Sequence, residues 1–306
     1  MNLDALVAPL RADVVSGATT VARTAAEVVR RAAVRIPADS PDALRGTLGE
    51  LTVKILDAQP AMAPLVCLAR VVLESVAQVG SVEEVRRVAA RTAEDFRSGV
   101  DERTREVGRR AAAHLPRDGT VVTLSSSSTV RAALLQGTAD PGLRVVCLES
   151  RPMQEGRMLA DAMARAGVRA IYAVDAAAGA LLEDADLLLL GADSIGDAGV
   201  VNKIGSALLA REAARLGLPV VVTADTTKLL PPGFPQHVAD DRPPEEVWRA
   251  PSGVHVWNRY FEVVSSDHVS VIVTEEDDLT PADVGALREA LTVPPEVRAW
   301  ADARGG

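Results

Sequence analysis

Cysteine, histidine and aromatic residues are scarce in this sequence. Cys67 and Cys147 are its two cysteines, and its four histidines never pair at ligand spacing. We therefore expect no disulfide framework, no structural metal and no cofactor. Aromatic residues make up 3% of the 306 residues. This removes the stacking surfaces that single-stranded nucleic acids require, so we expect no nucleic-acid partner.

The sequence also has no apolar run long enough to span a membrane, and its N-terminus lacks the basic segment of a secretory signal. The net charge is −9 and the sequence pI is about 5.1. An acidic chain without a basic stripe is a poor candidate for binding nucleic acids or anionic membranes. We expect a cytoplasmic protein that does not bind membranes.

The pattern of apolar residues divides the chain near residue 115. Before it, the sequence predicts only helices, including one that begins at Ser40-Pro41 and a long charged one after Ser81. After it, strands and helices alternate, which indicates a parallel sheet. We expect an α/β protein, with an N-terminal helical domain (1–115) and a Rossmann-like parallel-sheet domain (116–306).

One stretch of the second half combines a buried strand with polar residues. The four leucines 187–190 are typical of a strand covered on both faces, and Asp193 follows where that strand ends. We expect a loop over 194–201, and then Asn202 and Lys203 at the start of a helix. Ligands of open α/β sheets bind beyond the carboxyl ends of the strands, so these three side chains are candidate site residues.

Two other predicted strands also end in polar segments. Ser125 and the turn residues Ser126, Ser127 and Ser128 follow the first strand, and Lys228 follows the fifth. Consecutive hydroxyls before a helix favour an anion or sugar contact, although a simple serine N-cap would look similar. Arg151, after the second strand, is interpreted as pairing with Glu149 or Glu155 rather than with a ligand.

Several of these segments resemble one family. The sequence GADSIGDAG-VVNKIG (191–205) is similar to the signature of the initiation factor 2B alpha/beta/delta superfamily, and ESRPMQEGR (149–157) is similar to a second motif of that family. The superfamily includes methylthioribose-1-phosphate isomerase and ribose-1,5-bisphosphate isomerase. The resemblance implies a homodimer, a phosphorylated ligand held by Asn202, Lys203 and Lys228, and an acid–base role for Asp193.

The resemblance also exposes departures. Ser125 stands where the isomerases carry a cysteine that shares proton transfer with the aspartate. Gly17 and Ala18 match a substrate-binding segment, but Ser16 and Gln59 replace its arginines. A thiol ionises at about pH 8.5, whereas a serine needs a partner base, so Ser125 is a weak second acid–base group.

Two functions remain open from the sequence. One is an aldose–ketose isomerase acting on a phosphorylated pentose such as ribose 1,5-bisphosphate, with Asp193 and Ser125 as the catalytic candidates. The other is a non-catalytic protein that senses a sugar phosphate or nucleotide, as in the regulatory members of the superfamily. A dinucleotide-dependent dehydrogenase is disfavoured because no G-x-G-x-x-G segment follows the first strand.

Overall fold

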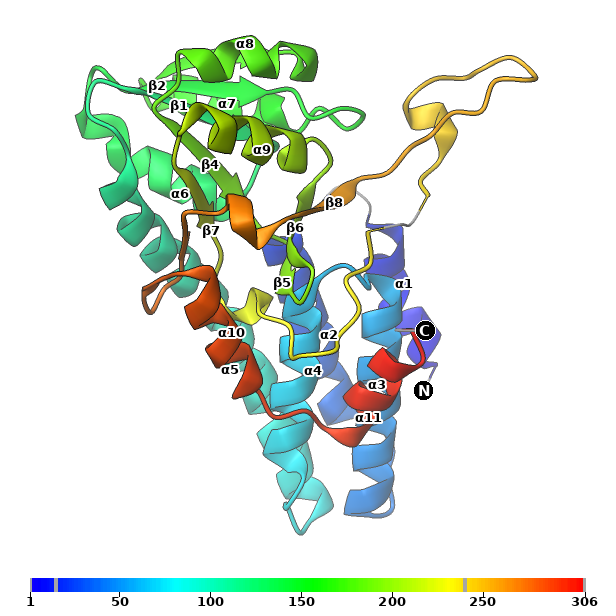
Figure 1. Ribbon diagram of the computed structural model, residues 1–306. Helices are drawn as coiled ribbons and strands as arrows, with labels where there is room; N and C mark the ends of the chain where they lie inside the picture. The colour runs from blue at the N-terminus through cyan, green and yellow to red at the C-terminus, as the bar shows by residue number, and fades with distance from the viewer. Residues whose placement is uncertain (1, 14–15, 239–240, 305–306) are drawn as a thin grey trace.

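The helical half of the protein forms one layered bundle. The computed structural model describes residues 2–13, 16–238 and 241–304 (Figure 1). The bundle contains α1 (Leu3–Ala12), α2 (Ala18–Arg35), α3 (Pro41–Ala58), α4 (Ala63–Val76) and α5 (Val82–Ala111). Ser40 caps α3 by accepting a hydrogen bond from the Ala43 amide at 3.1 Å, and Ser81 caps α5 through the Glu84 amide at 3.3 Å. Both predicted helix starts are confirmed.

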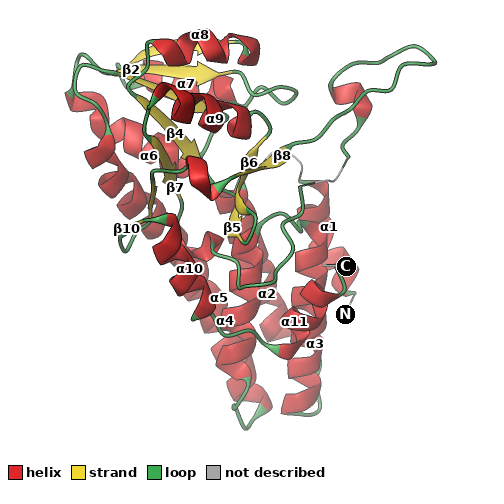
Figure 2. Ribbon diagram, in the orientation of Figure 1, coloured by secondary structure: helices red, strands yellow, loops and turns green. Residues whose placement is uncertain are grey.

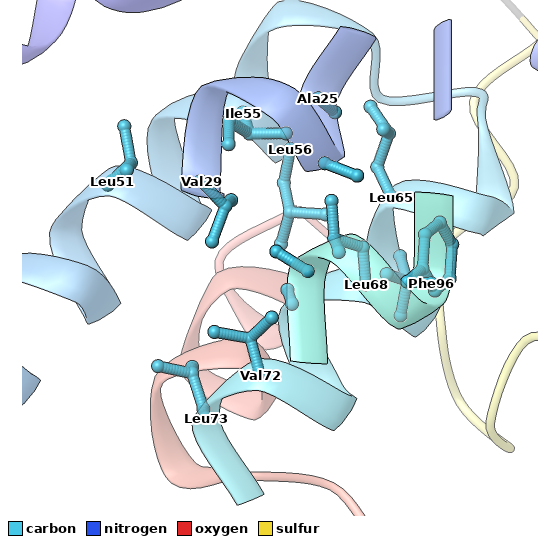
Figure 3. Packing of buried hydrophobic residues seen from close by; sticks show 14 of the residues in the cluster. Ala25, Val29, Leu51, Ile55, Leu56, Leu65, Leu68, Val72, Leu73 and Phe96 are labelled. Carbon is cyan, nitrogen blue, oxygen red and sulfur yellow. The ribbon is translucent and has the colours of Figure 1, made fainter. Parts of the chain in front are cut away.

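Most residues in the core of the bundle are aliphatic, and Phe96 is an aromatic member (Figure 3). Leu51, Leu65 and Val72 are fully buried in it. The end of the chain returns to this core through α11 (Pro295–Asp302), whose Trp300 indole donates to the Asp57 carboxylate at 2.7 Å. We therefore propose a sequence boundary near residue 115, with α11 packed in space against the first half.

The second half is built on a seven-stranded sheet (Figure 2). Its strand order is β10-β9-β7-β4-β1-β2-β3, and all strands are parallel except β10. Their bounds are β1 (Thr120–Leu124), β2 (Arg144–Leu148), β3 (Arg169–Ala173), β4 (Leu187–Gly191), β7 (Val220–Thr223), β9 (Val271–Val273) and β10 (Asp278–Leu279). The predicted parallel sheet is confirmed, with the leucine strand β4 at its centre.

Helices cover both faces of this sheet because its buried side chains alternate between them. Val121 packs on the same side as α6 (Ser128–Gln136) and α7 (Gly156–Arg165), whereas Val122 packs with α8 (Ala178–Glu183) and α9 (Ser206–Leu216). The chain runs outward from β1 to β3 and then returns to place β4 beside the other edge of β1. The ends of β1 and β4 are therefore a topological switch point, where α/β folds bind ligands.

A second sheet was not predicted. It contains β5 (Ser194–Gly196), β6 (Gly199–Lys203) and β8 (Phe261–Val264), so residues 194–201 form a hairpin rather than a loop. Gly199 has a φ of +127°, and a Cβ there would meet the Val264 carbonyl oxygen at 2.2 Å. The glycine that indicated a loop instead permits close strand pairing.

The remaining segments connect these layers. An extended excursion over residues 241–260 projects from the molecule and contains a short 3-10 turn, Pro244–Glu246 (Figure 1). α10 (Pro281–Glu289) links the sheet to α11. None of the described helices is both long and apolar enough to cross a membrane.

Candidate functional site

A cavity of about 410 Å³ lies at the switch point, between the sheet and the helical bundle. The helical half contributes the start of α2, together with Gln59 and Met62. The sheet half contributes the segments that follow β1, β4 and β7. All nine residues that the sequence singles out line this cavity: Gly17, Ala18, Ser125, Ser127, Ser128, Asp193, Asn202, Lys203 and Lys228. Their roles toward a ligand remain predictions.

Two helix N-termini border the cavity. Gly17 is the N-cap residue of α2 and has no side chain, while Ser127 caps α6 by accepting from the Val130 amide at 3.4 Å. The two starts are joined by a 2.7 Å hydrogen bond between the hydroxyls of Thr19 and Ser128. The first amides of a helix have no intrahelical acceptor and attract anions. This part of the wall therefore suits a phosphate group.

Ser127 also fixes the turn against the sheet. Its hydroxyl lies 2.9 Å from that of Thr129, which contacts the Thr223 hydroxyl at 2.9 Å. The turn approaches β4 so closely that a Cβ at Gly191 would meet Ser127 Oγ at 2.6 Å. The N-cap interpretation thus holds for Ser127, whose hydroxyl is largely engaged within the protein.

Ser125 differs from its neighbours. Its backbone is left-handed, with φ at +69°, which costs energy in a residue other than glycine. The hydroxyl lines the cavity and has no hydrogen-bond partner among the described residues. No histidine of the described chain lines the cavity either. Ser125 consequently lacks the partner base that a reactive serine needs.

The structure corrects the expected placement of Asn202 and Lys203. Both lie on β6, and α9 begins only at Ser206 after Gly205, whose φ is +103°. The N-terminus of α9 is already satisfied, because Glu262 accepts from the amides of Gly205 and Ala207 at 2.7 and 2.8 Å. This helix start is therefore occupied by a protein carboxylate and does not serve as the anion site.

Lys203 is held inside the cavity wall by an ion pair. Its ammonium lies 2.5 Å from Glu155 Oε1, and both side chains are almost fully buried. The rings of Tyr260 and Phe261 flank the same ammonium at 5.0 and 5.5 Å. Both aromatic residues line the cavity. Asn202 donates to the Ser206 hydroxyl at 3.0 Å.

Asp193 stands immediately beyond β4. Its amide donates to the Val201 carbonyl at 2.9 Å, and its carbonyl accepts from the Ala63 amide of α4 at 3.3 Å. The carboxylate has no hydrogen bond to any described residue. Burial raises the pKa of Asp193, the Lys228 and Lys203 ammoniums oppose the rise, and the Glu155 charge adds to it. A carboxyl of raised pKa in a cavity suits general acid–base catalysis.

Lys228 is buried, with 3% of its surface exposed, and its ammonium forms no hydrogen bond or ion pair with a described residue. It follows the 3-10 turn Thr226–Lys228 after β7, where Asp225 accepts from the Thr227 amide at 3.1 Å. An unpaired buried ammonium is costly unless something compensates it. Its position is consistent with a cation that holds a ligand phosphate.

Two arginines from the second half line the cavity, whereas none from the described part of the first half does. The Gln59 amide donates to the carbonyls of Leu10 and Asp13 at 2.8 and 2.6 Å, so it braces α1. Arg131 of α6 and Arg242 of the excursion line the cavity instead. The Arg242 guanidinium stacks on Tyr260 at 4.8 Å. The sequence offered no signal for Arg242, because its segment has no periodic pattern.

Two further sequence interpretations concern residues near the cavity. Arg151 donates to the Val247 carbonyl at 3.1 Å, so its expected pairing with Glu149 or Glu155 was wrong. Neither cysteine lines the cavity. Burial raises the pKa of the Cys67 thiol, and it raises the pKa of the Cys147 thiol to about 12. Across residues 2–13, 16–238 and 241–304, no cluster of His, Cys, Asp and Glu could hold a metal ion.

Comparison with known proteins agrees with this fold. The model of the initiation factor 2 subunit family matches residues 14–281, and the chain belongs to this family. It is 32% identical to a ribose 1,5-bisphosphate isomerase of Haloterrigena turkmenica over 295 residues, 90% of each chain. It is 26% identical to one of Thermococcus kodakarensis over 291 residues, again 90% of each chain.

Solved structures extend the comparison. The protein resembles a crystal structure titled translation initiation factor eIF-2B of Pyrococcus horikoshii, with a TM-score of 0.79 and 26% identity over 91% of this chain and 97% of that one. A 5-methylthioribose 1-phosphate isomerase of the same organism has a TM-score of 0.69 and 20% identity over 94% and 87% of the two chains. The latter likeness concerns the fold alone.

Proposed function

We propose that the protein is a sugar-phosphate isomerase that converts an aldose phosphate to a ketose phosphate, with ribose 1,5-bisphosphate as the first substrate to test. The observation that carries this proposal is that one cavity holds both Asp193, a carboxyl of raised pKa, and Lys228, whose ammonium forms no ion pair with a described residue. Relatives named ribose 1,5-bisphosphate isomerase, similar over 90% of the chain, support it.

The chemistry assigns separate tasks to these groups. Lys228, Arg131 and the α2 and α6 N-termini would hold phosphate, which positions the sugar. Asp193 would transfer the proton between adjacent carbons. Transfer of a proton by a positioned group contributes roughly 100- to 10,000-fold to such rates.

A second function is favoured by Ser125. The serine stands where the resemblance expects a thiol, and it has no base beside it. A protein that binds a phosphorylated ligand without converting it, and acts in regulation, fits that observation. The likeness to a structure titled translation initiation factor eIF-2B supports this alternative.

The test is an assay of purified protein with ribose 1,5-bisphosphate, read by product formation and by thermal shift. We expect turnover in the wild type. Asp193→Asn should reduce it by roughly 100- to 10,000-fold and preserve binding. A ligand at a hundred times its dissociation constant adds about 2.7 kcal/mol of stability, which makes binding readable. Binding without turnover in the wild type would favour the regulatory alternative. Absence of both binding and turnover would contradict both functions.

We also propose that the protein works in the cytoplasm as a homodimer. The excursion exposes Trp248, Trp257 and Val254, each about half accessible to solvent, and such apolar clusters mark interfaces. Sedimentation velocity at micromolar concentration should show a dimer, and Trp248→Ser with Trp257→Ser should shift it toward monomer. A monomeric wild type would contradict this part of the proposal.

A further inference from the structure

Glu155 holds a carboxylate oxygen that the protein leaves unused. The residue is 9% exposed, and Oε1 accepts from the Lys203 ammonium at 2.5 Å. Oε2 is buried and has no hydrogen-bond partner among the described residues. Buried polar atoms are satisfied in the great majority of cases, so each exception calls for an explanation. Because Glu155 lines the cavity, a ligand hydroxyl is the donor that would satisfy Oε2.

The local backbone holds this carboxylate rigidly. Ser150 and Gln154 are both left-handed, with φ of +62° and +58°. Asp175 fixes the turn by accepting from the amides of Ser150 and Arg151, each at 2.8 Å. A Cβ at Gly156 would meet the Leu148 carbonyl oxygen at 1.9 Å, so the start of α7 is pressed against the end of β2. A strained, well-fastened turn is a common way to position a functional side chain.

Isomerisation of an aldose to a ketose needs more than one proton-transfer group. In ribose 1,5-bisphosphate O1 carries a phosphate, so the bond from C1 to the ring oxygen O4 must break. The C2–H bond also breaks and a C1–H bond forms, while the proton on O2 is lost and O4 gains one. C2 is oxidised and C1 is reduced within one molecule, so no external oxidant takes part. Asp193 can serve the carbon-bound proton, but Ser125 has no base beside it. A second carboxylate in the same cavity removes this difficulty.

We infer, resting on the proposed function, that Glu155 is the second catalytic group and that it replaces the missing thiol. Its Oε2 accepts the hydroxyl proton from O2 of the substrate and supplies the proton that the ring oxygen O4 gains as the C1–O4 bond breaks, while Asp193 takes the proton from C2 and returns it to C1. Lys203 holds Oε1 throughout and thereby keeps Oε2 directed to the substrate. The substrate recognised at this position is a cyclic sugar 1-phosphate with a free hydroxyl on C2, next to the phosphorylated C1.

The test compares Glu155→Gln with Glu149→Gln, a matched change six residues earlier at a side chain that does not line the cavity. With ribose 1,5-bisphosphate, Glu155→Gln should lower kcat by roughly 100- to 10,000-fold and change KM only a few-fold. Glu149→Gln should retain wild-type kcat and KM. Circular dichroism and thermal unfolding of each variant verify that it is folded.

If Glu155→Gln does not fold, a second variant tests the same inference. Glu155→Asp keeps a charge opposite Lys203 but withdraws Oε2 by one methylene, and it should lower kcat by about 10-fold or more. If either folded variant retains more than half of the wild-type kcat, the inference is overturned and the isomerase proposal stands. A wild type that binds the bisphosphate without turnover overturns both.

Discussion

The charged residues of helix α5 and those of the cavity differ in their exposure to solvent and in how completely they are paired. On α5, Arg97 lies 2.6 Å from Glu94, and Arg109 lies 2.5 Å from Glu106, one helical turn away in each case. These side chains are largely exposed. Hydrogen bonds from the arginines lower the pKa of both glutamates. Each of these four charges meets a partner on its own helix.

In the cavity the charges are buried and incompletely paired. Lys228 forms no hydrogen bond or ion pair with a described residue through its ammonium, Glu155 leaves one oxygen without a hydrogen-bond partner, and burial raises the pKa of Asp193. Water screens and solvates the charges of α5, so their ion pairs contribute little to stability. The cavity charges lack that solvation. Their incomplete pairing therefore indicates a site that is completed by a ligand.

The choice of cation sharpens this contrast. The chain has 33 lysines and arginines, and only Lys54, Lys203 and Lys228 are lysines. Two of these three line the cavity. The third, Lys54, pairs with Asp4 at 2.9 Å near the surface. An ammonium binds phosphate as a compact point charge, whereas a guanidinium binds it through two parallel N–H donors.

Breaking the Lys203–Glu155 pair should have the largest effect on stability. Lys203→Met keeps the apolar stem beside Tyr260 but leaves the Glu155 carboxylate buried and unpaired. Loss of one member of a buried pair costs about 3–5 kcal/mol, and urea denaturation should show a decrease of that size in the free energy of unfolding.

The control for Lys203→Met lies on the exposed face. Arg97→Met removes a partner from Glu94 in water and should leave the unfolding midpoint nearly unchanged. The double variant Lys203→Met with Glu155→Met should recover much of the loss, because no buried charge then remains unpaired. A double variant no more stable than Lys203→Met would show that the two side chains are not coupled.

The contrast also explains how much of the fold could be predicted. β4 contains the four leucines 187–190 that predict it, because a strand buried in a parallel sheet is a short apolar run bounded by turn residues. The sequence did not predict the hairpin of β5 and β6, because short strands that end or begin at a glycine have the sequence pattern of a loop. Its partner β8 lies about sixty residues further along the chain.

The same limit applies to the site. Ser125, Asp193 and Lys228 were predictable as a group, since the carboxyl ends of parallel strands meet at one edge. Glu155 was interpreted as a partner of Arg151, yet its partner Lys203 lies 48 residues away in sequence. The position of Arg242 depends on its stacking against Tyr260 and on the hydrogen bond that its backbone amide donates to the Asn258 carbonyl. Pairings of this kind become visible only when the chain is folded.

Lys228→Ala sharpens the contrast with Lys203 and should have a smaller effect, confined to ligand binding. Lys228 forms no ion pair, and its loss removes only an attraction to Asp193 beyond ion-pair distance, so the free energy of unfolding without ligand should change less than in Lys203→Met. A hydrogen bond to a charged group contributes about 1.5–3 kcal/mol, so the Kd for ribose 1,5-bisphosphate should rise by roughly 10- to 100-fold. Isothermal titration calorimetry measures the change, and Lys54→Ala, which removes the surface lysine, serves as the control. Because the Lys228 charge opposes the rise in the pKa of Asp193, its loss should move that pKa still higher. Equal affinities for wild type and Lys228→Ala would contradict the role of this lysine in binding phosphate and would leave its burial without a functional reason.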